Sequence, residues 1–297
     1  MAEDPGRPAA VTWSAPAKIN LALHVTGRRA YGYHELDTLV VFADCGERVS
    51  VSPASDVTLA ICGPFAAHAP AGQANLAFRA ALELRKAVGT SGGAAAGAAI
   101  RLEKHLPAGA GLGGGSADAA ATLNALNILW QAGLNDRTLA ELGACLGADV
   151  AMCVHSRALR AGGIGEIIEP FSTLPRLPLV LLWPGKPAST ASLFKQLRDV
   201  SNTALPTPPN ACSTMEDLVD YLAHTRNDLQ ETAIEAEPAI AEALSALRET
   251  DQCLLWRMSG SGSACFGIYP DRAHAHAASQ VLVSRHKDWW VRAVRTR

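Results

Sequence analysis

The feature that most constrains this chain is a glycine-rich segment between a predicted strand and a predicted helix. Leu106 to Trp130 reads LPAGAGLGGGSADAAATLNALNILW, with five glycines inside seven residues. The preceding stretch, Ala99 to His105, alternates apolar and polar residues, which predicts a strand. The stretch after the glycines repeats leucines at helical spacing, so we expect a helix that begins at Ser116 and a run that ends at Gly133.

Such a loop suits an anionic ligand. Glycines have no Cβ, so their backbone adopts positive φ and approaches a ligand closely. Successive amides then point inward as an anion-binding nest, and the helix start adds unpaired N–H groups and the positive end of its dipole. The ligand that fits this description is a di- or triphosphate.

The spacing of the glycines excludes the commoner phosphate loops. A P-loop needs Gly-Lys-Ser/Thr after four intervening residues, and no Lys follows these glycines. Gly109, Gly111 and Gly114 spell G-x-G-x-x-G, but no acidic residue is placed on a following strand to bind a ribose. The simplest alternative is a turn that needs glycine only for its shape; the joint occurrence of strand, Pro107, glycines and helix favours phosphate binding.

Composition excludes several classes of protein. The 297 residues favour two domains, and 48% hydrophobic residues suffice for packed cores. A formal charge of −2 provides no basic field for nucleic acid. The seven cysteines form no C-x-x-C pair, so we expect mostly core residues in a reducing cytoplasm and no metal site. We expect neither a signal peptide nor a membrane span.

Four further places carry polar residues of interest. The strand Ile19 to Val25 alternates, and its polar face begins with Lys18 and Asn20; a solvated sheet face and a cleft wall both fit this pattern. Tyr33 and His34 follow a glycine turn. Asn75 is placed to cap a helix, and Asp136 another. Asp149 follows Gly147, which we expect to end the preceding helix.

Three segments resemble the motifs of the GHMP kinases and occur in the order typical of that family. They are APAKINLAL at 15–23, the glycine segment at 107–120, and SGSGSACF at 259–266. The form GLGGGSADAA is closest to the members that use ATP to phosphorylate the 2-hydroxyl of 4-diphosphocytidyl-2-C-methyl-D-erythritol, in the non-mevalonate route to isoprenoid precursors. The resemblance covers nearly the whole chain.

The resemblance implies an α+β fold in two domains, which agrees with the mixture of predicted strands and helices. Residues 1–172 would form a GHMP kinase N-terminal, ATP-binding domain of the ribosomal protein S5 domain 2-like type. Residues 173–297 would form a ferredoxin-like C-terminal domain. The active site would lie in the cleft between them.

The resemblance also implies a role for particular residues. Lys18 and Asp149 would be catalytic. The remaining residues fall into three groups: ATP-binding Asn75, Lys104, Pro107, Ala108, Gly109, Ala110, Gly111, Leu112, Gly113, Gly114, Gly115 and Ser116; substrate-binding Asn20, Tyr33, His34, Thr190 and Phe194; and a third-motif loop of Ser259, Gly260, Ser261 and Gly262. Two positions depart from the family pattern, Tyr31 in place of Asp and Ala151 in place of Pro.

The implied cofactors are ATP and Mg²⁺, with no protein ligand assigned to the metal. The partners would be small molecules, ATP and a cytidyl diphosphate ester, with neither nucleic acid nor membrane, in a monomer or a homodimer. The alternatives are another GHMP small-molecule kinase acting on mevalonate, homoserine or a sugar, a decarboxylase of the superfamily, and a non-catalytic nucleotide-binding member. The sequence Gly32-Tyr33-His34 favours the cytidyl substrate, and the presence of both Lys18 and Asp149 favours catalysis.

Overall fold

The computed structural model describes residues 9–30, 32–89, 97–171, 174–208, 212 and 214–297. The sequence predicts a tail at residues 1–10 and a Gly-Ala linker at 89–97. Most of both segments, and the departure at Tyr31, lie outside the described residues. Helices and strands are mixed, as the α+β prediction requires.

The chain forms two compact units that interleave along the sequence. Unit 1 consists of Met1–Ala17, Gly46–Ala108 and Gly113–Ser156; unit 2 consists of Lys18–Cys45, Gly109–Leu112 and Arg157–Arg297. The units follow spatial proximity rather than chain order, and the linear domain division at residue 172 stays a prediction.

Two long strands open the fold. β1 (Val11–Arg28) pairs with β2 (His34–Pro53), and each strand runs from one unit into the other. The sequence pattern over this stretch predicts two strands, at 38–42 and 48–52, and that prediction is wrong because β2 is continuous. Gly46, inside β2, packs so closely on β1 that a Cβ there would lie 2.2 Å from the carbonyl oxygen of Ala15.

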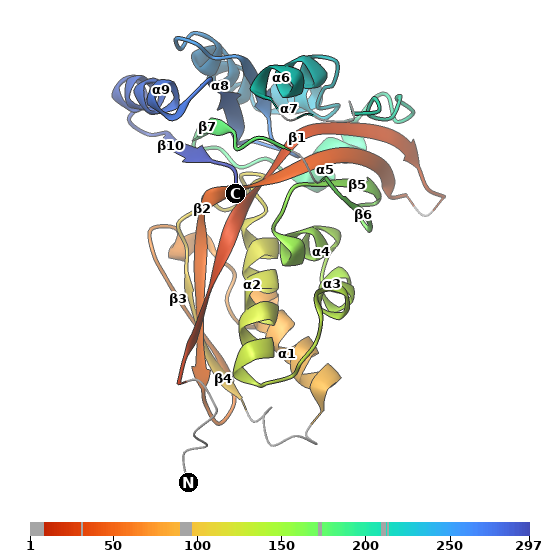
Figure 1. The fold of residues 1–297 in the computed structure, drawn as a ribbon, viewed down its shortest axis with the longest axis vertical. Helices are drawn as coiled ribbons and strands as arrows, with labels where there is room; N and C mark the ends of the chain where they lie inside the picture. The colour runs from red at the N-terminus through yellow and green to blue at the C-terminus, as the bar shows by residue number, and fades with distance from the viewer. Residues whose placement is uncertain (1–8, 31, 90–96, 172–173, 209–211, 213) are drawn as a thin grey trace. The chain divides into compact units, whose positions relative to one another are not determined.

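Unit 1 is a sheet with helices on one side. β3 (Val57–Cys62) and β4 (Ala98–Glu103) are parallel, and β4 pairs antiparallel with Arg48–Pro53 of β2. Figure 1 shows the helices of this unit on one side of these strands, and α1 contacts β3 while α2 contacts β4. The helices are α1 (Leu76–Val88), α2 (Gly114–Leu129), α3 (Asp136–Ala144) and α4 (Ala148–His155), with short 3-10 turns at Ala66–His68 and Gly72–Ala74.

Helix starts in unit 1 differ from prediction in three places. α2 begins two residues earlier than expected, after Gly113 in the left-handed conformation, because a glycine there needs no side-chain cap. The cap of α3 is Asn135, whose side chain accepts from the amide of Thr138, and Asp136 is the first helical residue. Gly147 does not end α3 but precedes α4.

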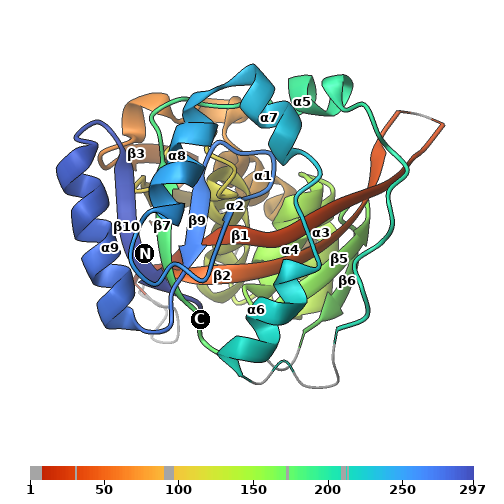
Figure 2. The ribbon, with the colours of Figure 1, turned by 90° about the horizontal axis from the view of Figure 1, so that it is seen from above.

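Unit 2 contains a four-stranded antiparallel sheet in the order β10-β7-β9-β8. With α8 and α9 packed on it, the chain order β7-α8-β8-β9-α9-β10 and this strand order are ferredoxin-like, as predicted (Figure 2). The elements are β7 (Pro178–Trp183), α5 (Thr190–Gln196), α6 (Met215–Ala223), α7 (Gln230–Ala236), α8 (Ala239–Arg248), β8 (Leu255–Met258), β9 (Cys265–Ile268), α9 (Arg272–Arg285) and β10 (Trp290–Arg295).

A hairpin completes unit 2, and apolar residues fill its core. β5 (Leu159–Gly163) pairs with Leu36–Val40 of β2 and with β6 (Ile167–Pro170). The core of unit 2 is built from β7, the helices and the end of β1, with members such as Val180, Leu244 and Leu282.

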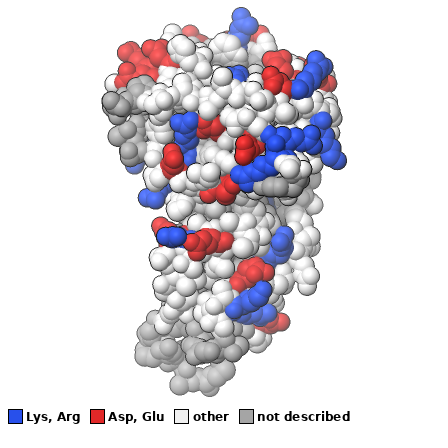
Figure 3. Space-filling view, turned by 90° about the vertical axis from the view of Figure 1, so that its right-hand side faces the viewer, with Lys and Arg blue, Asp and Glu red and all other residues white. Residues whose placement is uncertain are grey.

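The cysteine prediction is partly wrong. All seven cysteines are free thiols, but only Cys153, Cys212 and Cys265 are buried, and the other four are partly or fully exposed. Surface charge agrees with the composition: on the face drawn in Figure 3, positive and negative side chains occur side by side and much of the surface is uncharged.

We predict that Gly46→Ala destabilises the protein by about 2 kcal/mol or more, because the new methyl group meets backbone atoms that cannot move aside. Gly162→Ala is the matched control, since a Cβ on Gly162 of β5 would meet its nearest neighbour only at 3.8 Å. Chemical denaturation measures both free energies of unfolding. Equal stabilities for the two variants would contradict the close packing of β1 on β2.

Candidate functional site

The polar residues of β1 are buried in a closed hydrogen-bond network. Lys18 is 4% exposed and Asn20 is 2% exposed, so the solvated-face interpretation is wrong. The Lys18 ammonium donates to Oδ1 of Asn20 at 3.0 Å, and Nδ2 of Asn20 donates to the hydroxyl of Thr38 at 2.8 Å. That hydroxyl donates to the carbonyl of Ala22. The network therefore determines which way the Asn20 amide points.

Backbone hydrogen bonds bring parts of all three motifs together within unit 2. The amide of Lys18 donates to the carbonyl of Leu112 at 2.9 Å, which joins the first motif to the glycine segment. The amide of Ala264 donates to the carbonyl of Ala110 at 2.8 Å. The amide of Asn20 donates to the hydroxyl of Ser259 at 3.1 Å. These bonds fix Gly109–Leu112 against β1 and against the third-motif loop.

Two glycines at this junction are required by space. Gly111 has φ +77°, and a Cβ there would lie 2.7 Å from the carbonyl oxygen of Gly262 and 2.8 Å from that of Ser259. Gly260 has φ +60°, and its Cβ would lie 3.0 Å from Oδ1 of Asn20. Any other residue at Gly111 would separate the second and third motifs.

Residues expected to recognise the substrate also meet in unit 2. The rings of His34 and Phe194 stack at 4.9 Å with an interplanar angle of 25°. Nε2 of His34 is buried and has no hydrogen-bond partner among the described residues. Burial, and then the positive charge of Arg28, lower the pKa of His34, so its ring is neutral at pH 7. Thr190 shares a 2.6 Å hydrogen bond with Ser261 of the third motif, and Tyr33 is exposed.

Unit 1 holds the rest of the glycine segment and the N-terminus of α2. Gly113 has φ +66° and leads directly into the helix, so the first amides of α2 belong to Gly114, Gly115 and Ser116. Amides at a helix start have no partner inside the helix and favour an anion. A Cβ on Gly115 would lie 3.7 Å from Leu76, so the first turns of α1 and α2 adjoin.

Asn75 caps α1 as predicted. Its side-chain oxygen accepts from the amide of Ala77 at 2.9 Å, and its side-chain nitrogen donates to the carbonyl of Pro70. The capping interpretation is confirmed, and contact with a nucleotide base stays a prediction.

The other predicted site residues of unit 1 differ in how far they are buried. Pro107 is buried, and Ala108 is partly exposed. The ammonium of Lys104 is buried between the carboxylates of Glu47 and Asp118. Asp149 lies in the first turn of α4, partly exposed, where the helix dipole favours a carboxylate. Since Lys18 and Asp149 belong to different units, their pairing stays a prediction.

Asn227, which no sequence motif marks, supports the third motif. Its side chain donates to the carbonyls of Met258 and Gly260, both at 2.8 Å, and accepts from the amide of Leu229. The neighbouring Asp228 accepts from the amide of Val25 on β1. The available signal is an Asn-Asp pair just before a helix, but the sequence pattern predicts only that a helix begins at Asp228.

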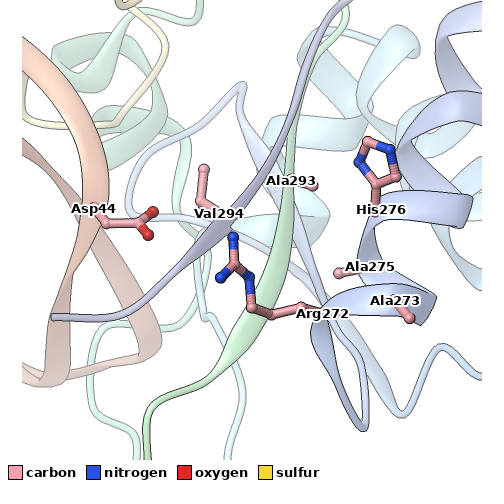
Figure 4. Close-up of a pocket in the computed structure, with 7 residues that line it drawn as sticks. All are labelled: Asp44, Arg272, Ala273, Ala275, His276, Ala293 and Val294. Carbon is pink, nitrogen blue, oxygen red and sulfur yellow. The ribbon is translucent and has the colours of Figure 1, made fainter.

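One surface pocket of unit 2 lies apart from these groups. Figure 4 shows Arg272, at the start of α9, extending toward Asp44 and Val294. No residue that lines this pocket belongs to the predicted site. Among the described residues, no three His, Cys, Asp or Glu side chains are grouped to hold a metal ion. Within the same residues, no helix has both the length and the apolarity needed to cross a bilayer.

Two family models match the chain. The model of the GHMP kinases N terminal domain matches residues 75–157, and that of the GHMP kinases C terminal matches residues 211–288. Together they include the glycine segment, Asp149 and the third motif, whereas the first motif precedes both.

Relatives match over nearly the full length. The 4-diphosphocytidyl-2-C-methyl-D-erythritol kinase of Dinoroseobacter shibae is 47% identical over 277 residues, 93% of this chain and 92% of that protein. The enzyme of the same name from Parvibaculum lavamentivorans is 46% identical, with 95% and 96% covered. A crystal structure of 4-(cytidine 5'-diphospho)-2C-methyl-D-erythritol kinase is 34% identical with a TM-score of 0.78, covering 96% of this chain and 99% of that one.

A more distant structure shares the fold alone. The mevalonate kinase of L. major, solved in complex with R-mevalonate, has a TM-score of 0.64 at 14% identity, with 100% of this chain and 99% of that chain covered.

We predict that Asn227→Ala destabilises the protein by about 2–4 kcal/mol, because the carbonyls of Met258 and Gly260 lose their donors while buried. Asn124→Ala is the control, since this partly exposed α2 side chain donates a single bond to the carbonyl of Ala120. Thermal denaturation compares the variants, and hydrogen exchange reports on the amides of 259–264. Unchanged exchange in that loop would show that Asn227 does not support it.

Proposed function

The chain belongs to the GHMP kinase family and, within it, to the 4-diphosphocytidyl-2-C-methyl-D-erythritol kinases, and on that premise we propose how its residues carry out the reaction. The reaction moves the γ-phosphoryl group of ATP to the 2-hydroxyl of 4-diphosphocytidyl-2-C-methyl-D-erythritol, giving the 2-phosphate and ADP. It belongs to the non-mevalonate synthesis of isoprenoid precursors. The observation that best supports this acceptor is the stacked pair of His34 and Phe194 with its unpartnered imidazole nitrogen.

The pair of His34 and Phe194 suits a cytosine ring. An aromatic base offers a flat π-face for stacking and an edge with donors and acceptors. A neutral imidazole supplies a donor or an acceptor to that edge, and Nε2 of His34 has no other partner among the described residues. We assign Tyr33 a second stacking role, since its ring is exposed, and Thr190 a position at the edge of the third motif. Mevalonate and homoserine have no base, so they would leave this nitrogen unsatisfied.

The glycine segment would hold the triphosphate of ATP. The positive φ angles at Gly109, Gly111 and Gly113 expose backbone amides, and the first amides of α2 add the positive end of a helix. The remaining members of the predicted ATP set, Asn75, Lys104, Pro107 and Ala108, flank this segment in sequence or start the neighbouring helix.

Mg²⁺ fits this site as an ion carried by ATP. Mg²⁺ commonly binds substrate phosphates and water with one or two protein oxygens, and no dedicated three-residue cluster exists among the residues that the structure describes. Ser116, in the first turn of α2, is the hydroxyl we assign to it. When bound, the ion shares the negative charge of the transferred phosphoryl group.

The transfer itself needs an aligned nucleophile and a place for its proton. We assign Asp149 as the general base that accepts the proton of the 2-hydroxyl. We assign Lys18 to orient that carboxylate and to stabilise the negative charge on the transferred phosphoryl group. Asn20, held by Thr38 and Lys18, would position the erythritol end of the acceptor.

One assay tests the acceptor. ADP release is followed with 4-diphosphocytidyl-2-C-methyl-D-erythritol, mevalonate, homoserine and galactose as separate acceptors. Turnover of the cytidyl ester alone supports the proposal, and turnover of another acceptor at an equal or greater kcat/KM overturns it. Oligomeric state and the cytoplasmic location stay predictions.

We predict that Asp149→Asn lowers kcat by roughly 10²–10⁴-fold while KM for both substrates stays within a few-fold, because the amide keeps the size but accepts no proton. Asp136→Asn is the matched control, an exposed aspartate in the first turn of α3. Steady-state kinetics decide the matter. A kcat for Asp149→Asn near that of the wild type would assign the proton to another group.

We predict that His34→Ala raises KM for the cytidyl substrate at least about tenfold, the effect of losing ~1.4 kcal/mol of binding, and leaves KM for ATP unchanged. His68→Ala, an exposed histidine of unit 1, is the control. The pH profile provides a second measurement: because the pKa of His34 lies below its ordinary value of 6.5, KM for the cytidyl substrate should be flat above pH 6.5 and rise only at lower pH, where the ring gains a proton. An equal rise of KM for the cytidyl substrate and for ATP would indicate a general folding defect instead.

A further inference from the structure

Three charged side chains that take no part in the chemistry proposed above are buried together in unit 1. The ammonium of Lys104 lies 2.7 Å from Oε1 of Glu47 and 2.6 Å from Oδ2 of Asp118. The three side chains are 6%, 0% and 4% exposed. We call them the Lys104 cluster.

The Lys104 cluster connects the two ends of the glycine segment. Glu47, on β2, also accepts from the backbone amides of His105 and Leu106, the residues that lead into the segment. Asp118 stands on α2, the helix that leads out of it. One ammonium therefore joins the entrance, through Glu47, to the exit, through Asp118.

The position of the cluster relative to α2 supports this connection. A Cβ built on Gly114, the first residue of α2, would lie 3.5 Å from Oε1 of Glu47 and 3.6 Å from Nζ of Lys104. The cluster is thus packed against the backbone whose amides would face the phosphates in the proposed function. Glu47 and Lys104 therefore contact the first residue of α2, and Asp118 belongs to the same helix.

Stability alone does not explain why three charged side chains are buried in the Lys104 cluster. Buried charges lose hydration, and a buried ion pair often stabilises a fold no better than apolar residues of the same size. Burial outweighs the attraction of Lys104 and, with the nearby charge of Glu47, raises the pKa of Asp118 to about 7. Oδ1 of Asp118 has no hydrogen-bond partner within the described part of the chain. What the cluster does supply is a directional link, since each charge has a defined partner.

We propose that Glu47, Lys104 and Asp118 are positioning residues, which hold the entrance and the exit of the glycine segment at the separation that lets its amides converge on the phosphates of ATP. The proposal rests on the proposed function only in taking ATP as the ligand of this segment. It assigns Lys104 an action through the loop, in place of the direct nucleotide contact that the sequence implied.

The test is calorimetry with ATP and Mg²⁺ and without any acceptor. Asp118→Leu removes the link to α2 at similar volume and leaves Lys104 paired with Glu47, and we expect ATP affinity to fall about tenfold. The ATP affinity of Lys104→Met should fall by a similar factor. The ATP affinity of the double variant should be no lower than that of either single variant, as for groups that act as one unit. Asp118→Asn, which keeps an acceptor, should lose only a part of the affinity.

Thr122→Val is the matched control. Thr122 is fully buried one turn further along α2, and its hydroxyl donates to the backbone carbonyl of Asp118. This variant should lower the melting temperature but keep the ATP affinity of the wild type. If Asp118→Leu does not fold, Asp118→Asn is compared with Thr122→Val in the same way.

Three results would overturn the proposal. A folded Asp118 variant with wild-type ATP affinity would show that the link to α2 is not needed. A loss in Lys104→Met alone would indicate that the ammonium contacts ATP directly. If Thr122→Val lost as much ATP affinity as the Asp118 and Lys104 variants, the effect would be explained by general destabilisation. Failure of the wild-type protein to bind ATP would instead contradict the proposed function, which keeps the two failures distinct.

Discussion

The close approach of two backbone loops at Gly111 is the contact on which the rest of the structure depends. A side chain there would overlap the carbonyls of Gly262 and Ser259, so the second and third motifs touch only because Gly111 has none. The bonds from Ala264 to Ala110 and from Lys18 to Leu112 secure the same four-residue stretch on its other sides. Segments separated by about half the chain are thereby held in one place.

Once the loop is held, the polar residues around it must all find partners, because an unsatisfied buried polar group is costly. Lys18, Asn20 and Thr38 satisfy one another along β1 and β2, and Asn227 satisfies the carbonyls of the third motif. Nε2 of His34, like Oδ1 of Asp118, is buried and finds no hydrogen-bond partner within the described residues. A buried group left without a partner next to an aromatic ring is what a binding site for a polar, flat ligand requires.

The proposed sites for the phosphates and for the base therefore depend on different kinds of interaction. In the proposed mechanism, phosphate binding would rely on backbone amides, whose directions are determined by positive φ angles and by the start of α2. Base recognition would rely on side chains, the stacked His34 and Phe194. Fixed charge lies next to the first residue of α2, in the Lys104 cluster. Backbone amides suit the nucleotide that all such kinases share, and side chains suit the acceptor that distinguishes them.

The sequence by itself determined the strand, the glycine segment and the helix after it, and the cap at Asn75, because these follow from local periodicity and from glycine's freedom at positive φ. The ferredoxin-like unit followed from the resemblance to the family. The resemblance also grouped His34 with Phe194, and the rings of these two residues stack. Only the tertiary structure decided that Lys18 and Asn20 are buried rather than solvated, and that Glu47 pairs with Lys104 and Asp118. Periodicity indicates which residues share a face of a strand. Whether that face is buried depends on which distant segment covers it, and this is decided by contacts between residues far apart in the chain.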